Sequence, residues 1–148
     1  MLGELVDRVR CESTRDGSRT DRAKRVAELI RAATGRRWVG IYAVTSDRVD
    51  NLAWSGPSPP AYPTFPASKG LTGAAIGLRS TVVSNDVAND PRYLTALEST
   101  GSEMIVPVIV EGTVVGTVDV EDERLDAFSS QDEELFEEIA AAVRPLYA

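Results

Sequence analysis

Histidine is absent from this chain of 148 residues, and cysteine occurs once, as Cys11. The lack of histidine excludes Ser-His and Cys-His nucleophile pairs, histidine-ligated haem and the usual catalytic zinc sites. The single cysteine excludes an intramolecular disulfide, a CxxC motif and a cysteine-rich metal site. We expect no role for Cys11 itself, a surface redox role being the less favoured interpretation. Few kinds of catalysis are compatible with both absences.

Long apolar runs are also missing, since none approaches the roughly 18–20 residues that cross a bilayer. The first ten residues mix acidic and basic side chains, unlike a signal peptide. We therefore expect a cytoplasmic protein with no membrane partner. The formal net charge of −7 argues against nucleic acid as a partner, because phosphates require a basic surface. A hydrophobic content of 43% is ordinary for one soluble domain with a real core.

The order of apolar patterns predicts the fold class. Helical spacing appears over residues 2–10, from Thr20 or Asp21 to Gly35, over 71–78, after Ser129 or Ser130, and weakly within 92–100. Strand patterns cover residues 37–45, 49–55, 81–84 and 102–122. This order predicts an α+β fold with an antiparallel sheet of about six strands. We expect the N- and C-terminal helices on one face of the sheet and a ligand pocket on the other.

Two segments bear on that pocket. The strand over 37–45 is apolar on both faces, and Trp38 and Tyr42 share one of them, either as plain core or as a pocket wall. The segment 56–66 contains five prolines, so it can pair with a strand only at a sheet edge. It is either a stiff cover over a cavity or a rigid surface connector, and the sequence leaves both interpretations open.

Acidic residues interrupt the β-hairpin predicted over residues 102–122. Asp119 and Glu121 are two apart in one strand and therefore share a face. A two-residue loop would place Met104 opposite Asp119, whereas a three-residue loop with left-handed Gly112 in a bulge would place Glu103 there. Because glycine at the last loop position favours the bulged form, we predict that Glu103 faces Asp119.

Three carboxylates would then gather at one end of the sheet, where like charges repel. A cation, a bound ammonium group or a shared proton must offset that repulsion. The alternative interpretation is that these acids lie at a solvent-exposed strand end. We predict no resident metal or other cofactor, although calcium held by carboxylate oxygens stays open.

The segments KGLTGAAI, VVSNDVANDPRY and VIVEGTVVGTVDVE resemble those of a GAF domain over roughly residues 20–147. We accordingly divide the chain into an N-terminal helical extension, residues 1–19, and a single GAF domain, residues 20–148. The stretches RWVGIY, F-P followed by KG-L-x-G, and SEMIVPVIVEGTVVGTVDVE are similar to the free-methionine-(R)-sulfoxide reductase branch.

The resemblance to that branch implies roles for particular residues. Its substrate pocket has a tryptophan and a tyrosine, at the positions of Trp38 and Tyr42, and acids at the positions of Glu103, Asp119 and Glu121. The last of these is an aspartate in the branch. The three positions at which the branch carries cysteine thiols are occupied here by Tyr62, Thr72 and Ala96. Reduction of a sulfoxide by this route uses cysteine thiols that end the cycle as a disulfide, and these three positions carry no thiol.

We therefore predict a catalytically silent GAF domain that binds a small cationic or zwitterionic, amino-acid-like molecule. The predicted ligand-binding residues are Trp38, Tyr42, Tyr62, Thr72, Glu103, Asp119 and Glu121, with no catalytic residue. One alternative is a residual methionine-sulfoxide reductase activity. Another is a ligand-free module that forms a homodimer through its terminal helices and buries the apolar residues Leu2, Val9 and Leu146.

Overall fold

The structure is a computed structural model that describes residues 2–94 and 97–148. Its helices are α1 (Leu2–Thr14), α2 (Arg19–Thr34), α3 (Gly70–Leu78) and α4 (Ser130–Ala142), with 3-10 turns η1 (Val87–Asn89) and η2 (Arg144–Tyr147). Its strands are β1 (Trp38–Val44), β2 (Arg48–Ser55), β3 (Thr64–Pro66), β4 (Val82–Ser84), β5 (Ser102–Val110) and β6 (Thr113–Asp122). Among the described residues, no helix has the length and apolar character required to cross a membrane.

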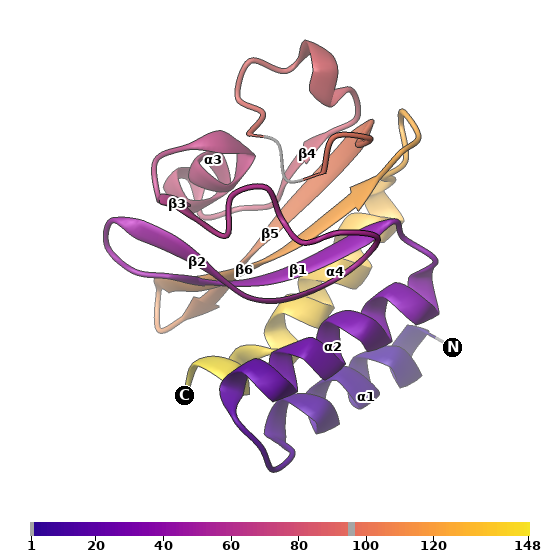
Figure 1. Ribbon diagram of the computed structural model, residues 1–148. Helices are drawn as coiled ribbons and strands as arrows, with labels where there is room; N and C mark the ends of the chain where they lie inside the picture. The colour runs from indigo at the N-terminus through magenta and orange to yellow at the C-terminus, as the bar shows by residue number, and fades with distance from the viewer. Residues whose placement is uncertain (1, 95–96) are drawn as a thin grey trace.

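The six strands form one sheet in the order β3-β2-β1-β6-β5-β4, and every neighbouring pair is antiparallel. Helices α1, α2 and α4 cover one face, and α3 with its flanking segments lies over the other (Figure 1). This arrangement confirms the predicted α+β architecture. The short strand β3 was not predicted. It lies at the sheet edge, where prolines 63 and 66 remove the fewest ladder hydrogen bonds.

The main apolar core lies between the sheet and the helix layer. Leu5, Val6 and Val9 of α1 belong to it, together with residues from α2, β1, β5, β6 and α4. Val9 and Leu146 are buried within the chain, at 0% and 1% exposure, so they offer no free surface to a second copy. The side chain of Leu2 lies outside what the structure describes. A homodimer through the terminal helices, like the division at residue 19, stays a prediction.

Helix ends differ from the sequence prediction by up to four residues, most at α1, which continues to Thr14 and does not end near residue 10. Ser18 rather than Thr20 or Asp21 caps α2, because its hydroxyl accepts a hydrogen bond from the backbone N–H of Asp21 at 3.0 Å. Gly35 ends this helix in the left-handed region, as predicted. Ser129 caps α4 reciprocally with Asp132. No helix occurs within the described part of 92–100; the helical turn in this neighbourhood is η1, which precedes it.

The hairpin between β5 and β6 has a different register from the one predicted. Val110 pairs with Thr113 across a two-residue turn, Glu111-Gly112, in which both residues have positive φ, 50° and 80°. This is the type I′ conformation that suits the twist of a hairpin. The prediction of a three-residue loop was therefore wrong.

A bulge further along the hairpin, and not a three-residue loop, places the three acidic side chains on one face of the sheet. Val108 pairs with Gly116 but Ile109 pairs with Val114, so Val115 is an extra residue in β6. Beyond this bulge Glu103 pairs with Glu121, and not with Asp119 as predicted. A side chain alternates faces along a strand, so Glu103, Asp119 and Glu121 nevertheless share one face.

Candidate ligand-binding site

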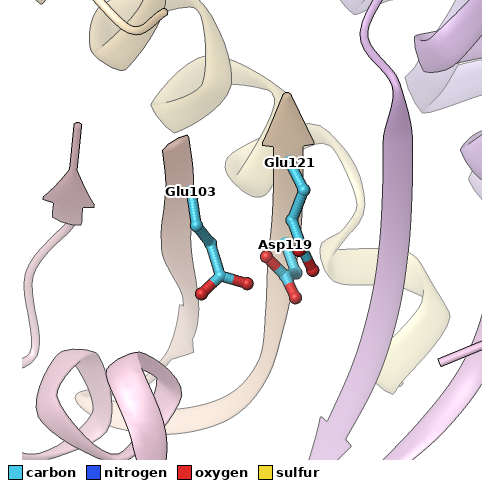
Figure 2. A group of neighbouring side chains, drawn as sticks. All are labelled: Glu103, Asp119 and Glu121. Carbon is cyan, nitrogen blue, oxygen red and sulfur yellow. The ribbon is translucent and has the colours of Figure 1, made fainter. Parts of the chain in front are cut away.

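Three carboxylates meet on the face of the sheet opposite the helix layer. Glu103 begins β5 while Asp119 and Glu121 lie near the end of β6, and Figure 2 shows their carboxylate groups converging. One carboxylate oxygen from each residue lies within 4.8 Å of the other two. The residues are 3%, 3% and 0% exposed. The interpretation of these acids as a solvent-exposed strand end was therefore wrong.

The described residues supply hydrogen bonds to this cluster but no ion-pair partner. Glu121 Oε1 accepts from the Thr100 hydroxyl at 2.5 Å and from the Tyr93 hydroxyl at 3.3 Å. Asp119 Oδ1 and Glu121 Oε2 are buried without a hydrogen-bond partner in the part of the chain that the structure describes. Among the described residues, no arginine or lysine forms an ion pair with any of the three acids. A buried carboxylate without a counter-charge is strongly disfavoured.

Without a ligand, the cluster can lower its buried negative charge by binding protons. Burial raises the pKa of Glu103 well above its ordinary value, and the negative charges of Asp119 and Glu121 raise it further. Burial, followed by the charge of Glu121, also raises the pKa of Asp119 well above normal. The pKa of Glu121 is raised by burial against the lowering effect of hydrogen bonds, that from Thr100 foremost. The cluster therefore holds protons at a pH at which isolated carboxyl groups have lost them.

Strand β1 runs beside this cluster and presents its aromatic face to it. Trp38 pairs with Glu121 across the ladder, and Gly40 pairs with Asp119. Gly40 has no side chain, and the rings of Trp38 and Tyr42 occupy the space above it: a Cβ there would lie 2.5 Å from Trp38 Cη2 and 2.9 Å from Tyr42 Cε1. Glycine at this position therefore lets both rings lie next to the carboxylates.

Both rings are held in place by further contacts. The Trp38 indole N–H donates to the Ser58 carbonyl at 3.0 Å, which ties the ring to the proline-rich segment. Tyr42 packs edge-on against Phe65, with ring centroids 5.9 Å apart. Burial raises the pKa of Tyr42 well above normal, and the charge of Asp119 adds to this effect. Trp38 and Tyr42 are 0% and 2% exposed, so they are both buried and adjacent to the acids.

A cavity of about 20 Å³ lies against the cluster. Five predicted site residues line it: Tyr42, Tyr62, Thr72, Glu103 and Asp119. Phe65, Gly70, Leu71 and Leu94 line it as well and were not predicted. Trp38 and Glu121 are not among the residues that line this cavity. Such a volume holds about one water molecule, so an amino-acid-sized ligand requires the covering segments to move apart.

The cover consists of segments that the sequence places far from the hairpin. Tyr62, half exposed at 49%, comes from the proline-rich connection, and Leu94 comes from the segment after η1. Ala96, at the third position where the resemblance implied a cysteine, lies outside the described residues. Tyr93 and Thr100 were missed because their contacts with Glu121 depend on how this segment folds back over β6. No local pattern in the sequence signals that packing.

The described fold places the lone thiol away from the cluster. Cys11 is exposed on α1, and α1 lies in the helix layer, across the sheet from α3 and the segments that cover the carboxylates (Figure 1). A thiol in this position does not contact a molecule bound beside Glu103 and Asp119 in the same chain.

Comparison with known proteins agrees with this architecture. The family model described as "GAF domain" matches residues 18–144. The chain therefore belongs to the GAF domain family.

Individual relatives carry more specific names. The chain is 28% identical over 103 residues to GAF domain-containing protein A of Dictyostelium discoideum, a match covering 69% of this chain and 64% of the relative. It is 28% identical over 109 residues to the free methionine-R-sulfoxide reductase of Saccharomyces cerevisiae, covering 72% and 60%. The chain thus spans about three fifths of the length of these two relatives.

The structural comparison points to the same group. The type II free methionine-R-sulfoxide reductase from Thermoplasma acidophilum superposes with a TM-score of 0.81 at 26% identity, covering 87% of this chain and 92% of that one. Free methionine-R-sulfoxide reductases are therefore among both the sequence relatives and the structural neighbours of this GAF domain.

Proposed function

We propose that this GAF domain is a catalytically silent sensor that binds a small cationic or zwitterionic, amino-acid-like molecule between the carboxylate cluster and the aromatic face of β1. The ligand's ammonium group would lie among Glu103, Asp119 and Glu121. Its apolar part would rest against Tyr42, with Trp38 as the neighbouring ring on the same face, and an ammonium group over the Tyr42 ring would gain a cation–π attraction of roughly 0.5–2 kcal/mol. Tyr62 and Thr72 would close the pocket around it.

The observation that carries this proposal is a buried carboxylate cluster that has no cationic partner among the described residues. Within the described residues, Asp119 Oδ1 and Glu121 Oε2 have no hydrogen-bond donor, and an ammonium group offers three donors together with a positive charge. The ligand would supply the hydrogen-bond donors and the positive charge that the described part of the chain does not supply. Anionic ligands are disfavoured, because a carboxylate cluster repels them.

Opening of the pocket is a requirement of the proposal. The cavity of about 20 Å³ must widen, and Tyr62 is the lining residue best placed to move because half of its surface is exposed. The segment that carries it is fixed at Trp38 through the Ser58 carbonyl. Movement of Tyr62 would therefore leave the aromatic wall in place.

Binding should be tested by thermal unfolding against amino acids, methionine sulfoxide, polyamines and cyclic nucleotides, since a ligand specific for the folded state raises the melting temperature. Glu103→Ala should weaken a cationic ligand by about 1.5–3 kcal/mol, the scale of a hydrogen bond to a charged group. Glu111→Ala, at the exposed hairpin turn, is the matched control. Unchanged affinity in Glu103→Ala would remove Glu103 from the site.

The reductase relatives favour a second candidate, residual reduction of methionine sulfoxide. This activity would need a thiol, and Cys11 is the only cysteine of the chain. Incubation with methionine sulfoxide and a dithiol should yield no turnover above that of the buffer. Turnover that is lost in Cys11→Ser would establish the reductase activity and overturn the catalytically silent assignment.

A further inference from the structure

Three buried oxygen atoms on one face of β6 have no hydrogen-bond partner within residues 2–94 and 97–148. They are Thr117 Oγ1, Asp119 Oδ1 and Glu121 Oε2. Residues 117, 119 and 121 alternate with core residues along the strand, so their side chains lie on the face that bears the cluster. Thr117 is 0% exposed and is not one of the acids. Buried polar atoms without partners are rare in folded proteins and mark places where another group binds.

The spacing of the carboxylates matches the ligands of a hard cation. Oxygen atoms from Glu103, Asp119 and Glu121 lie within 4.8 Å of one another. Calcium binds oxygen at about 2.3–2.6 Å and magnesium at about 2.0–2.1 Å, and oxygen atoms within this limit can reach an ion of either size. Magnesium usually keeps several water molecules, for which this buried site lacks room, so the site favours calcium.

The space and the charge also favour an ion. The cavity beside Glu103 and Asp119 measures about 20 Å³, which accommodates an ion or one water molecule without movement of the cover. Three ionised carboxylates carry three negative charges. A single ammonium group offsets one of these charges, whereas a divalent cation offsets two. The atoms of the cluster that could coordinate an ion are all carboxylate oxygen atoms, and oxygen is the ligand that hard cations prefer.

We infer that Glu103, Asp119 and Glu121 bind one divalent cation of calcium's size when no organic ligand is present. The ion uses the same oxygen atoms as the ammonium group of the proposed organic ligand, so the two compete. The inference itself does not depend on the proposed function.

The test uses the full chain freed of metal with EDTA and then dialysed against metal-free buffer. Calcium alone should raise the melting temperature progressively, and magnesium at the same concentration should raise it less. Terbium is a luminescent substitute for calcium. Its emission on excitation of tryptophan should rise on binding, because Trp38 pairs with Glu121 across the ladder, and calcium should reverse this rise.

Substitutions at the proposed ligands, compared with a control elsewhere in the hairpin, test whether the ion binds at the cluster. Asp119→Asn should raise the dissociation constant for calcium by at least about tenfold, the lower end of the cost of losing a residue that supports a metal site. Glu121→Gln, which keeps the side-chain shape, should also weaken calcium binding and guards against loss of the fold in the first variant. Glu111→Gln, at the exposed hairpin turn, should bind as the wild type does.

Two outcomes would overturn the inference: a melting temperature that calcium leaves unchanged, or calcium binding that is equal in Asp119→Asn and wild type. The amino-acid and polyamine panel, repeated in EDTA, separates this inference from the proposed function. A thermal shift from an organic ligand without any calcium effect refutes the ion site alone. A calcium effect without any shift from the panel supports the ion site and counts against the proposed organic ligand.

Discussion

Neutralising one member of the carboxylate cluster, by Glu103→Gln, should change how the stability of the protein depends on pH. In the unfolded chain the three acids titrate near pH 4, whereas burial raises their pKa in the folded state. The folded protein therefore binds more protons than the unfolded chain above that pH. Its stability must fall as pH rises toward the folded pKa values.

The size of this effect follows from proton linkage. Each additional proton held by the folded state lowers the free energy of unfolding by about 1.4 kcal/mol per pH unit. The cluster's contribution is fully present below the unfolded pKa and is lost as pH rises through the folded pKa. Removing one ionisable member should reduce the slope between about pH 5 and pH 7 by up to that amount.

Other acids affect a different pH window. Hydrogen bonding from Arg124 lowers the pKa of Asp122 to about 2, so its contribution is present above its unfolded pKa and is lost as pH falls toward 2. The same direction holds for Asp90, whose pKa Arg92 lowers. These groups remain ionised between about pH 5 and pH 7 in both states, so the cluster determines the slope there.

The assay is urea unfolding of wild type and Glu103→Gln across this range in EDTA, followed by tryptophan fluorescence. Wild type should lose stability as pH rises, and Glu103→Gln should lose less. Glu111→Gln, at the exposed turn of the same hairpin, should match the wild-type slope. A wild-type stability that increases from about pH 5 to pH 7, or an identical slope in Glu103→Gln, would refute the reasoning.

Three further substitutions test the frame around the site by urea unfolding. Gly40→Ala places a Cβ 2.5 Å from Trp38 Cη2 and should cost about 1–3 kcal/mol of stability; stability equal to wild type would show that the rings can move aside. Arg36→Met removes a buried 3.2 Å ion pair to Asp122 and a 3.1 Å pair to Asp132. Because Arg124 still pairs with Asp122, the change should cost about 1–3 kcal/mol, and a cost under about 1 kcal/mol would show that these pairs contribute no more than surface pairs do. Tyr147→Phe removes a 2.6 Å hydrogen bond to the backbone of β1 and should cost about 1 kcal/mol; no loss would mean that water replaces it.

The sequence predicted the layers of this fold because their signals are local. Apolar residues at helical spacing marked α2 and α4, and β-branched runs marked β1, β5 and β6. The cap of α2 was misplaced because Ser18 and Thr20 are both good capping residues. The bulge at Val115 was missed even though Gly116 follows it directly, because a glycine inside a strand marks a close backbone approach as readily as a bulge. The three acids were correctly placed on one face, but for the wrong reason.

The composition of the site was harder to predict than its location. The carboxylates and the aromatic face follow from the period of two along the strands. The contacts of Tyr93 and Thr100 with Glu121 depend on a long connection that folds over β6. The small size of the cavity depends on how the side chains of several segments fill the space beneath that cover. Neither property is encoded in a short sequence motif.

The titration of the three carboxyl groups tests the central claim most directly. It can be followed by the ¹³C NMR signals of Glu103, Asp119 and Glu121 in metal-free protein and assigned with Glu→Gln and Asp→Asn variants. We predict that Glu103 and Asp119 titrate well above the ordinary carboxyl pKa and that a bound cation, organic or metallic, moves their titration to lower pH. Titration of all three near pH 4, unaffected by any cation, would contradict the existence of a buried cation-binding cluster.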